Sequence, residues 1–236
     1  MFSSDLANDA SLKNVLEVDS IMLSFGSRNI VTDCYLQCCT GDIMGLLGRN
    51  GCGKSSLLKI IFGTLETENK SIRINKQVYT HPYKEGHLIA YLPQHGFLPQ
   101  SLTLKKIIDL YIHTDSGKTT LLSDERVKSL YAKRVSELSG GERRYFEVLL
   151  LISMDVKFIL LDEPFSYVEP IYRQTIMDLI RRYTSHIGFI ITDHDYRNII
   201  EISDRIVLLT NGVCKHIKNL EELERWGYLP PGKLEH

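Results

Sequence analysis

The stretch "GRNGCGKSS", residues 48–56, lies between an apolar run, "GDIMGLLG" at 41–48, and a run with helical spacing, "KSSLLKIIF" at 54–62. The fixed positions of the pattern Gly-x-x-x-x-Gly-Lys-Ser are filled by Gly48, Gly53, Lys54 and Ser55. Between a strand and a helix this pattern binds phosphate, because glycines let backbone N–H groups approach closely and the helix N-terminus adds partial positive charge. We therefore predict a phosphate loop; the alternative is a tight turn that requires glycine.

The side chains of this loop predict the ligand that it takes. Lys54 can reach the β- and γ-phosphates of a nucleoside triphosphate, and the Ser55 hydroxyl can ligate Mg²⁺. We expect the other residues of the loop to line the same nucleotide, namely Asn50, Gly51 and Ser56.

A second apolar run ends in carboxylates. The stretch "FILLDEP", residues 158–164, reads as a central parallel strand that ends at Asp162 and Glu163. Asp162 can hold Mg²⁺ through water, and Glu163 can accept a proton from an attacking water molecule. A lone Asp-Glu pair at a strand end is usually only solvated. The phosphate loop upstream favours the catalytic interpretation.

Two further apolar runs end in polar side chains. Gln94 follows "YLP" at 91–93, and His194 follows "IITD" at 190–193. Parallel strands present their ligands at their carboxyl ends, so His194 should lie beside Glu163 and the γ-phosphate, and Gln94 stands at another strand end. We expect Gln94 to contact Mg²⁺ and water, and neutral His194 to orient the water and the γ-phosphate. Alone, either residue would be read as structural.

The stretch "LSGGERRYFEV", residues 138–148, places two glycines at the start of a predicted helix, which makes a second anion site. The phosphate loop, Gln94, "LSGGE", "LLDEP" and His194 follow one another in the order and spacing of ATP-binding cassette ATPases, and the resemblance covers about residues 15–226. It implies ATP and Mg²⁺ as ligands. It also implies a head-to-tail dimer in which one subunit contacts the γ-phosphate bound to the other through Ser139, Gly140 and Gly141.

Other positions match this family less closely. Phe25 resembles the aromatic residue that stacks on adenine, and a buried core aromatic is the alternative. Tyr167 and Glu169 stand where the family usually has a small residue and an aspartate, which puts communication between the two ATP sites in doubt. Cys52 lies within the phosphate loop, where a helix N-terminus lowers a thiol pKa. Alkylation of Cys52 is expected to block nucleotide binding; the alternative is a small tolerated side chain.

The element pattern predicts an α/β fold, a P-loop NTPase with a RecA-like core sheet, an N-terminal antiparallel β subdomain and a helical insert. We expect an N-terminal extension (1–14), a single ATPase domain (15–226) with its core at 15–95 and 136–226 and a helical subdomain at about 96–135, and a C-terminal tail (227–236). The final "LEH" resembles a tag remnant. We also predict individual elements: strands at 15–18, 21–25 and 30–38, helices at 170–183 and 219–226, and a hairpin turn at 211–212.

Composition excludes several classes of protein. The net charge of -1 gives no attraction to nucleic acid, so no nucleic-acid partner is expected. Five cysteines without a CxxC pair favour reduced thiols rather than disulfides, and Cys34, Cys38 and Cys39 read as small buried hydrophobes rather than a metal cluster. The longest apolar run, "FEVLLLISM", is shorter than the ~20 residues of a membrane helix. Any membrane role therefore requires a partner.

These observations favour an ATPase subunit of a membrane transporter, at the cytoplasmic face of the cell membrane through an integral membrane partner. The sequences of its motifs are most similar to those of the ATPases of lipopolysaccharide export and branched-chain amino-acid import. The alternative is a soluble single-cassette ATPase that assembles a protein or cofactor complex. A third hypothesis, suggested by Tyr167 and Glu169, is a regulatory module that hydrolyses ATP poorly.

Overall fold

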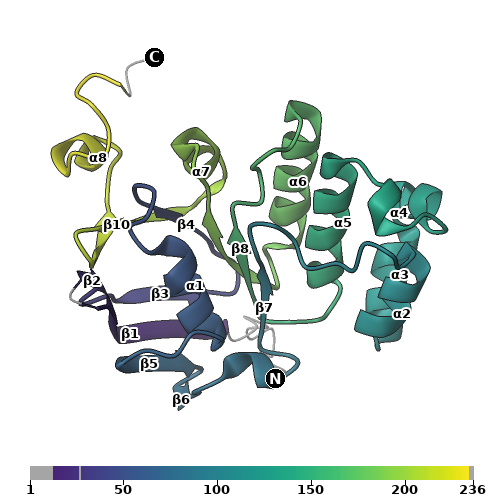
Figure 1. The fold of residues 1–236 in the computed structure, drawn as a ribbon, viewed down its shortest axis with the longest axis horizontal. Coiled ribbons are helices and arrows are strands. Elements are labelled where there is room, and N and C mark those ends of the chain that lie inside the picture. Colours follow the sequence, from purple (N-terminus) through teal and green to yellow (C-terminus); the bar gives the residue numbers. More distant parts are fainter. Residues whose placement is uncertain (1–12, 27, 234–236) are drawn as a thin grey trace, which may run out of the picture.

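The computed structural model describes residues 13–26 and 28–233, in two sheets with helices between and around them (Figure 1). Most of the predicted N-terminal extension and the "LEH" sequence lie outside the described residues. The α/β prediction is confirmed, with an antiparallel subdomain, a mainly parallel core sheet and a helical insert.

The larger sheet carries the predicted site residues. Its six strands run in the order β11-β10-β4-β9-β8-β7, and all neighbours are parallel except β10 and β11. Their bounds are β4 (Ile43–Leu47), β7 (Ile89–Leu92), β8 (Phe158–Asp162), β9 (Gly188–Thr192), β10 (Arg205–Thr210) and β11 (Val213–Ile217). Every residue of β4, β8 and β9 is buried, as expected for parallel strands covered on both faces.

The smaller, antiparallel sheet is built around one long strand. It contains β1 (Val15–Phe25), β2 (Arg28–Val31), β3 (Leu36–Cys39), β5 (Asn69–Ile74) and β6 (Gln77–Val78). The predicted strands at 15–18 and 21–25 are one strand, which passes through Ser20 at φ 55 with a shift in its pairing to β5. The predicted strand at 30–38 is two strands, because β2 and β3 pair with different parts of β1.

Helices cover both faces of the larger sheet. Helix α1 (Lys54–Phe62) lies between the two sheets, and α5 (Gly140–Ile152) and α6 (Pro170–Tyr183) lie on the other face (Figure 1). Alternate residues of β8 divide between the two cores: Leu160 packs beneath the smaller sheet, whereas Leu161 packs among the α5 and α6 side chains. The site residues therefore stand on a strand that is fixed from both sides.

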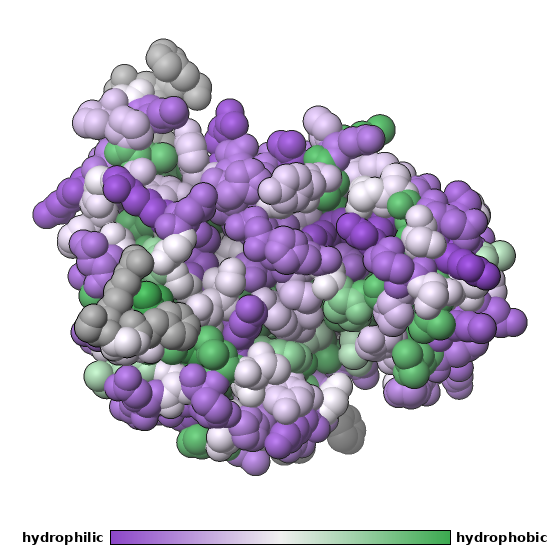
Figure 2. All heavy atoms as spheres, in the orientation of Figure 1, coloured by the Kyte–Doolittle hydropathy of each residue, from purple (hydrophilic) through white to green (hydrophobic). Residues whose placement is uncertain are grey.

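The helical insert extends to one side of the sheets. It comprises α2 (Leu104–Tyr111), α3 (Asp115–Ser123) and α4 (Glu125–Leu130). Two short 3-10 helices lie at Pro82–Lys84 and Val135–Glu137. In the described residues no helix is long and apolar enough to cross a membrane. Hydrophilic side chains dominate the face shown in Figure 2, and hydrophobic residues form small separate patches there.

The C-terminal third matches its predictions closely. Helix α6 spans the predicted residues, and α8 (Glu221–Arg225) lies within the predicted 219–226. The hairpin turns at Asn211 and Gly212, with φ values of 50 and 78, as the asparagine-glycine pair predicts. One element was not predicted: α7 (Tyr196–Ile202), a short helix capped by Asp195.

The prediction of reduced thiols is wrong for one pair. Cys34 and Cys214 form a disulfide, with their Cα atoms 4.9 Å apart and a separation of 180 positions in sequence. The neighbouring residues Asp33 and Val213 pair as an isolated bridge, which brings the two chain segments side by side. Cys38 is a buried free thiol whose Sγ contacts the Phe189 carbonyl at 3.6 Å, consistent with its predicted place in the core.

Candidate active site

The phosphate loop joins β4 to α1 at the carboxyl edge of the larger sheet. Gly51 and Gly53 adopt left-handed φ values of 75 and 108. A Cβ on Gly48 would lie 2.7 Å from the Leu209 carbonyl oxygen, so the loop needs glycine there. Lys54 is buried and its Nζ donates to the Gly48 carbonyl at 2.8 Å. The amine is thus held within the loop, at the wall of the cleft.

A cleft of about 680 Å³ opens beside this loop. Its lining brings together the following predicted residues: Asn50, Gly51, Gly53, Lys54, Ser55, Ser56, Gln94, Glu163 and His194. Ile30 and Tyr167 complete the lining. Segments more than a hundred residues apart therefore converge on one cavity, as expected where parallel strands end at a common edge.

Two of the three residues predicted to bind Mg²⁺, Ser55 and Asp162, are in direct contact. Asp162 ends β8, and its Oδ1 accepts hydrogen bonds from Ser55 Oγ at 3.0 Å and from Thr192 Oγ1 at 2.9 Å. Its Oδ2 accepts from the Tyr91 hydroxyl at 2.9 Å. Burial, together with the nearby Asp162 charge, raises the pKa of Tyr91, which therefore remains a donor. A carboxylate beside a serine hydroxyl is a hard oxygen set that suits Mg²⁺.

Glu163 is held at the edge of the cleft by its backbone and its side chain. It adopts φ 53, and its N–H donates to the Thr192 carbonyl at 3.0 Å. Its Oε2 accepts from Gln94 Nε2 at 2.8 Å and from Ser166 Oγ at 3.0 Å. A left-handed conformation is costly for a non-glycine residue and is typical of functional sites. The carboxylate is oriented but still 15% exposed, so water can reach it.

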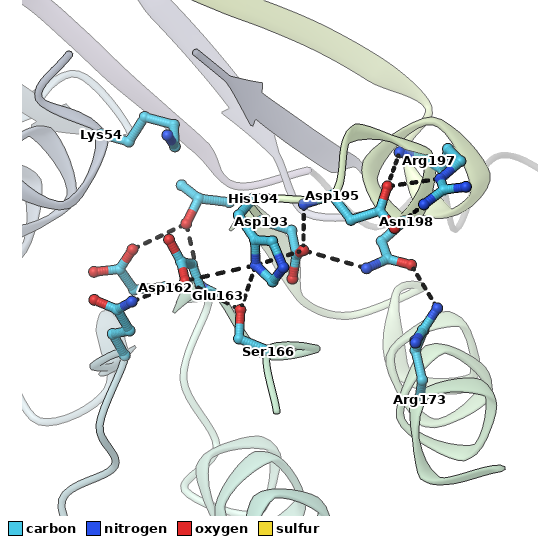
Figure 3. Close-up of polar contacts among 12 residues, drawn as sticks. Lys54, Asp162, Glu163, Ser166, Arg173, Asp193, His194, Asp195, Arg197 and Asn198 are labelled. Carbon is cyan, nitrogen blue, oxygen red and sulfur yellow. Dashed lines mark hydrogen bonds and ion pairs between the residues drawn. The ribbon is translucent and has the colours of Figure 1, made fainter. Parts of the chain in front are cut away.

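His194 belongs to the same hydrogen-bonded group and contacts Ser166, which also contacts Glu163 (Figure 3). Its Nδ1 is 2.8 Å from Ser166 Oγ and 3.9 Å from Glu163 Oε2. Asp193 lies behind it, with Oδ1 3.5 Å from Nδ1. Burial raises the pKa of Asp193, although N–H donors from Asp195 and Asn198 partly offset this. The imidazole is therefore flanked by acceptors and by one hydroxyl.

The predicted second anion site lies outside this cleft. Ser139 caps α5: its Oγ accepts from the Glu142 N–H at 3.2 Å, while the Glu142 side chain accepts from the Ser139 N–H at 2.7 Å. Gly140 is exposed, and Gly141 packs so closely on Tyr172 that a Cβ would lie 2.4 Å from that ring. Within the described chain the structure does not bring Ser139, Gly140 and Gly141 to the phosphate loop.

Some predictions for single residues are untested or wrong, and some site residues were not predicted. The side chain of Phe25 lies outside the described residues, so its contact with adenine stays a prediction. Cys52 lines two smaller hollows beside the loop and not the cleft, and burial raises its pKa, which contradicts the expected lowering. Tyr91, Ser166 and Thr192 carry no motif of their own, and sequence reasoning missed them.

Comparisons with known proteins agree on one family. A profile of the ABC transporter family matches residues 31–166. The chain is 36% identical to an uncharacterized ABC transporter ATP-binding protein of Rhizobium meliloti, over 80% of this chain and 74% of that protein. It is 30% identical to the lipopolysaccharide export system ATP-binding protein LptB of Acidithiobacillus ferridurans, over 85% and 88%. A solved ATP-binding subunit of an ABC transporter superposes with a TM-score of 0.80 at 22% identity, over 94% and 96% of the two chains.

Proposed function

The chain belongs to the ABC transporter family of ATP-binding ATPases, and from this premise we propose that it powers a membrane transporter by Mg²⁺-dependent, dimer-coupled ATP hydrolysis. The observation that carries this proposal is the cluster at the carboxyl ends of β4, β7, β8 and β9. There the phosphate loop, Asp162 and Glu163 line or border one cleft.

The residues of the cleft divide the chemistry among them. Lys54 would exchange its bond to the Gly48 carbonyl for the β- and γ-phosphates, and the loop N–H groups would bind the same oxygens. Ser55, Asp162 and Gln94 would hold Mg²⁺, which supplies positive charge to the phosphate oxygens. Glu163 would accept the proton of the attacking water, because its carboxylate lines the cleft and water can reach it.

We propose that a second copy of the chain completes this site. The helix that begins at Gly140 starts at an exposed residue that does not line its own cleft. A head-to-tail partner would bring Ser139, Gly140 and Gly141 to the γ-phosphate. ATP would then hold the dimer together, and loss of the γ-phosphate would loosen it.

We also propose an integral membrane partner at the cytoplasmic face of the membrane. An apolar hollow of about 330 Å³ lies between the core and the helical insert. Its aromatic and sulfur-containing lining includes Phe62, Tyr83, Tyr91, Phe97, Tyr111 and Met154. Tyr91 also donates to Asp162, so a partner seated in this hollow would contact a residue that touches the metal site. The relative LptB is named for an export system, which supports a transport role for this chain.

The test uses Glu163→Gln, with the surface variant Glu85→Gln as its matched control. We expect the first to lose at least about 100-fold in ATP turnover while it still binds ATP, because only the proton acceptor is removed. The control should hydrolyse ATP like the wild type. Equal turnover by Glu163→Gln and wild type would refute the assigned base, and a wild type without turnover would favour a regulatory module.

The same variant identifies the partner. Glu163→Gln, purified from native membranes with ATP and Mg²⁺, should carry a multispanning membrane protein at near-equal stoichiometry, as mass spectrometry would show. Recovery of soluble partners alone would favour a cassette that acts in assembly.

A further inference from the structure

Ser166 lies between the two groups on which hydrolysis is proposed to depend. Its side chain is almost fully buried, at 3% exposure, in the segment between β8 and α6. Its Oγ is 3.0 Å from Glu163 Oε2 and 2.8 Å from His194 Nδ1 (Figure 3). Gln94 Nε2 contacts the same glutamate oxygen at 2.8 Å. The four side chains therefore form one chain, from Gln94 through Glu163 and Ser166 to His194.

A hydroxyl has a single proton to donate, and this limits what Ser166 can do at once. The Glu163 carboxylate can only accept. If Ser166 donates to Glu163, Nδ1 of His194 must carry hydrogen and donate to Ser166. If Ser166 donates to Nδ1 instead, that nitrogen must be bare, and Glu163 loses the serine bond. The two arrangements exclude one another.

We propose that Ser166 is a positioning residue whose hydroxyl proton couples the tautomer of His194 to the availability of Glu163 as the base. This rests on the proposed ATPase function. In the first arrangement the neutral imidazole has a bare Nε2, which cannot donate to phosphate. In the second arrangement Nε2 carries the hydrogen and can donate to the γ-phosphate, while Glu163 Oε2 keeps the Gln94 hydrogen bond but gains a free lone pair for the attacking water.

The proton balance of this switch is simple. The imidazole releases its Nδ1 hydrogen to solvent and takes one from solvent at Nε2, so its charge does not change. Solvent can reach the ring, because the His194 side chain is 55% exposed. The Ser166 proton rotates from Glu163 to Nδ1 and remains on the serine. No bond other than these N–H and hydrogen bonds changes.

The consequence is an ordered activation of water. A γ-phosphate that accepts from Nε2 favours the second arrangement, which draws the Ser166 proton away from Glu163. The base is then freed when the triphosphate is in place. Glu163 and Asp193 are the charged groups near the ring, with oxygens 3.9 Å and 3.5 Å from Nδ1. Both are acceptors, so neither can replace the serine as a donor to a bare Nδ1.

A spectroscopic experiment tests the tautomer directly in the full chain. Histidine labelled with ¹⁵N reports which nitrogen carries hydrogen, and the His194→Gln variant assigns the signal. In wild type without nucleotide we expect hydrogen on Nδ1. With Mg²⁺ and a non-hydrolysable ATP analogue we expect it on Nε2. The same tautomer in both states, or an imidazolium with hydrogen on both nitrogens, would overturn the proposal.

Kinetics test the coupling. We expect Ser166→Ala to lower kcat about 10- to 100-fold with the ATP dissociation constant within about twofold of wild type, because the base and the histidine lose their link but the phosphate loop is intact. Its His194 tautomer should no longer respond to the analogue.

Two further variants are controls. Ser166→Thr keeps the hydroxyl and should recover part of kcat. Ser153→Ala removes an equally buried hydroxyl, hydrogen-bonded to the Leu149 carbonyl in α5, and should turn over normally.

The outcomes separate this proposal from the proposed function. If the wild type neither binds nor hydrolyses ATP, the function itself is wrong. If the wild type hydrolyses ATP and Ser166→Ala does so at the same rate, only the serine proposal fails. If Ser166→Ala does not fold, the wild-type tautomer measurement and Ser166→Thr still decide it.

Discussion

Replacement of Arg144 by methionine tests how the Gln94 segment is held in place. Arg144 lies in the first turns of α5, with a side chain only 9% exposed. Its guanidinium donates to the Gln94 carbonyl at 2.5 Å and to the Pro93 carbonyl at 3.3 Å. Its Nη1 also lies 3.2 Å from Glu147 Oε2, and Glu147 is 1% exposed. One side chain therefore neutralises a buried carboxylate and anchors the segment that carries Gln94.

The expected loss of stability is large because the carboxylate remains. Arg144→Met keeps most of the apolar volume but leaves Glu147 buried without its counter-ion, which typically costs about 3–5 kcal/mol. The two hydrogen bonds to carbonyls would each contribute about 1 kcal/mol, partly within that figure. We expect a decrease of about 4 kcal/mol in the free energy of unfolding. Adding Glu147→Gln removes the charge and should restore about half of it.

The pH dependence of the free energy of unfolding tests the same explanation independently. Burial raises the pKa of Glu147 above its usual value even with Arg144 present, and removal of Arg144 raises it further. The folded variant then binds more protons than the unfolded chain, so its stability falls as pH rises. We expect Arg144→Met to become more stable from pH 8 toward pH 5, with a steeper slope than wild type. The double variant should lose this slope.

Urea unfolding, followed by circular dichroism at several pH values, measures both quantities. A loss below about 1 kcal/mol for Arg144→Met would refute the view that the pair is buried and mutually dependent. So would a double variant that is less stable than the single one, because it would show that Glu147 is not the source of the cost.

Gly141→Ala would place a Cβ 2.4 Å from the Tyr172 ring, so we expect the start of α5 to shift and calorimetry to show a lower melting temperature; an unchanged one would contradict the packing. Burial raises the pKa of Cys52, so maleimide should label it slowly at pH 7 and faster as pH rises, scored by mass spectrometry against Cys52→Ala; rapid labelling at pH 7 would show an exposed thiolate. Cys34→Ser removes a link between residues 180 apart and should lower the free energy of unfolding by about 2–4 kcal/mol, a difference from wild type that dithiothreitol should abolish.

The predictions that matched the structure rest on local chemistry. The phosphate loop, the asparagine-glycine hairpin turn and α6 each follow from residues within a few positions of one another. The gathering of Gln94, Glu163 and His194 at one cleft also followed, because parallel strands end at a common edge and each residue directly follows an apolar run. A short helix such as α7 was missed, since seven residues give too little periodicity.

Sequence alone thus determined the fold of this protein, its family resemblance and most of the residues that line the cleft. Tertiary structure alone decided which side chains touch: Ser166 between Glu163 and His194, Tyr91 and Thr192 on Asp162, and the Cys34–Cys214 disulfide. Most of these pairs are separated by tens to hundreds of residues in sequence. Their contacts depend on strand order and on packing between sheets, and serine, tyrosine or cysteine carries no local pattern that specifies a distant partner.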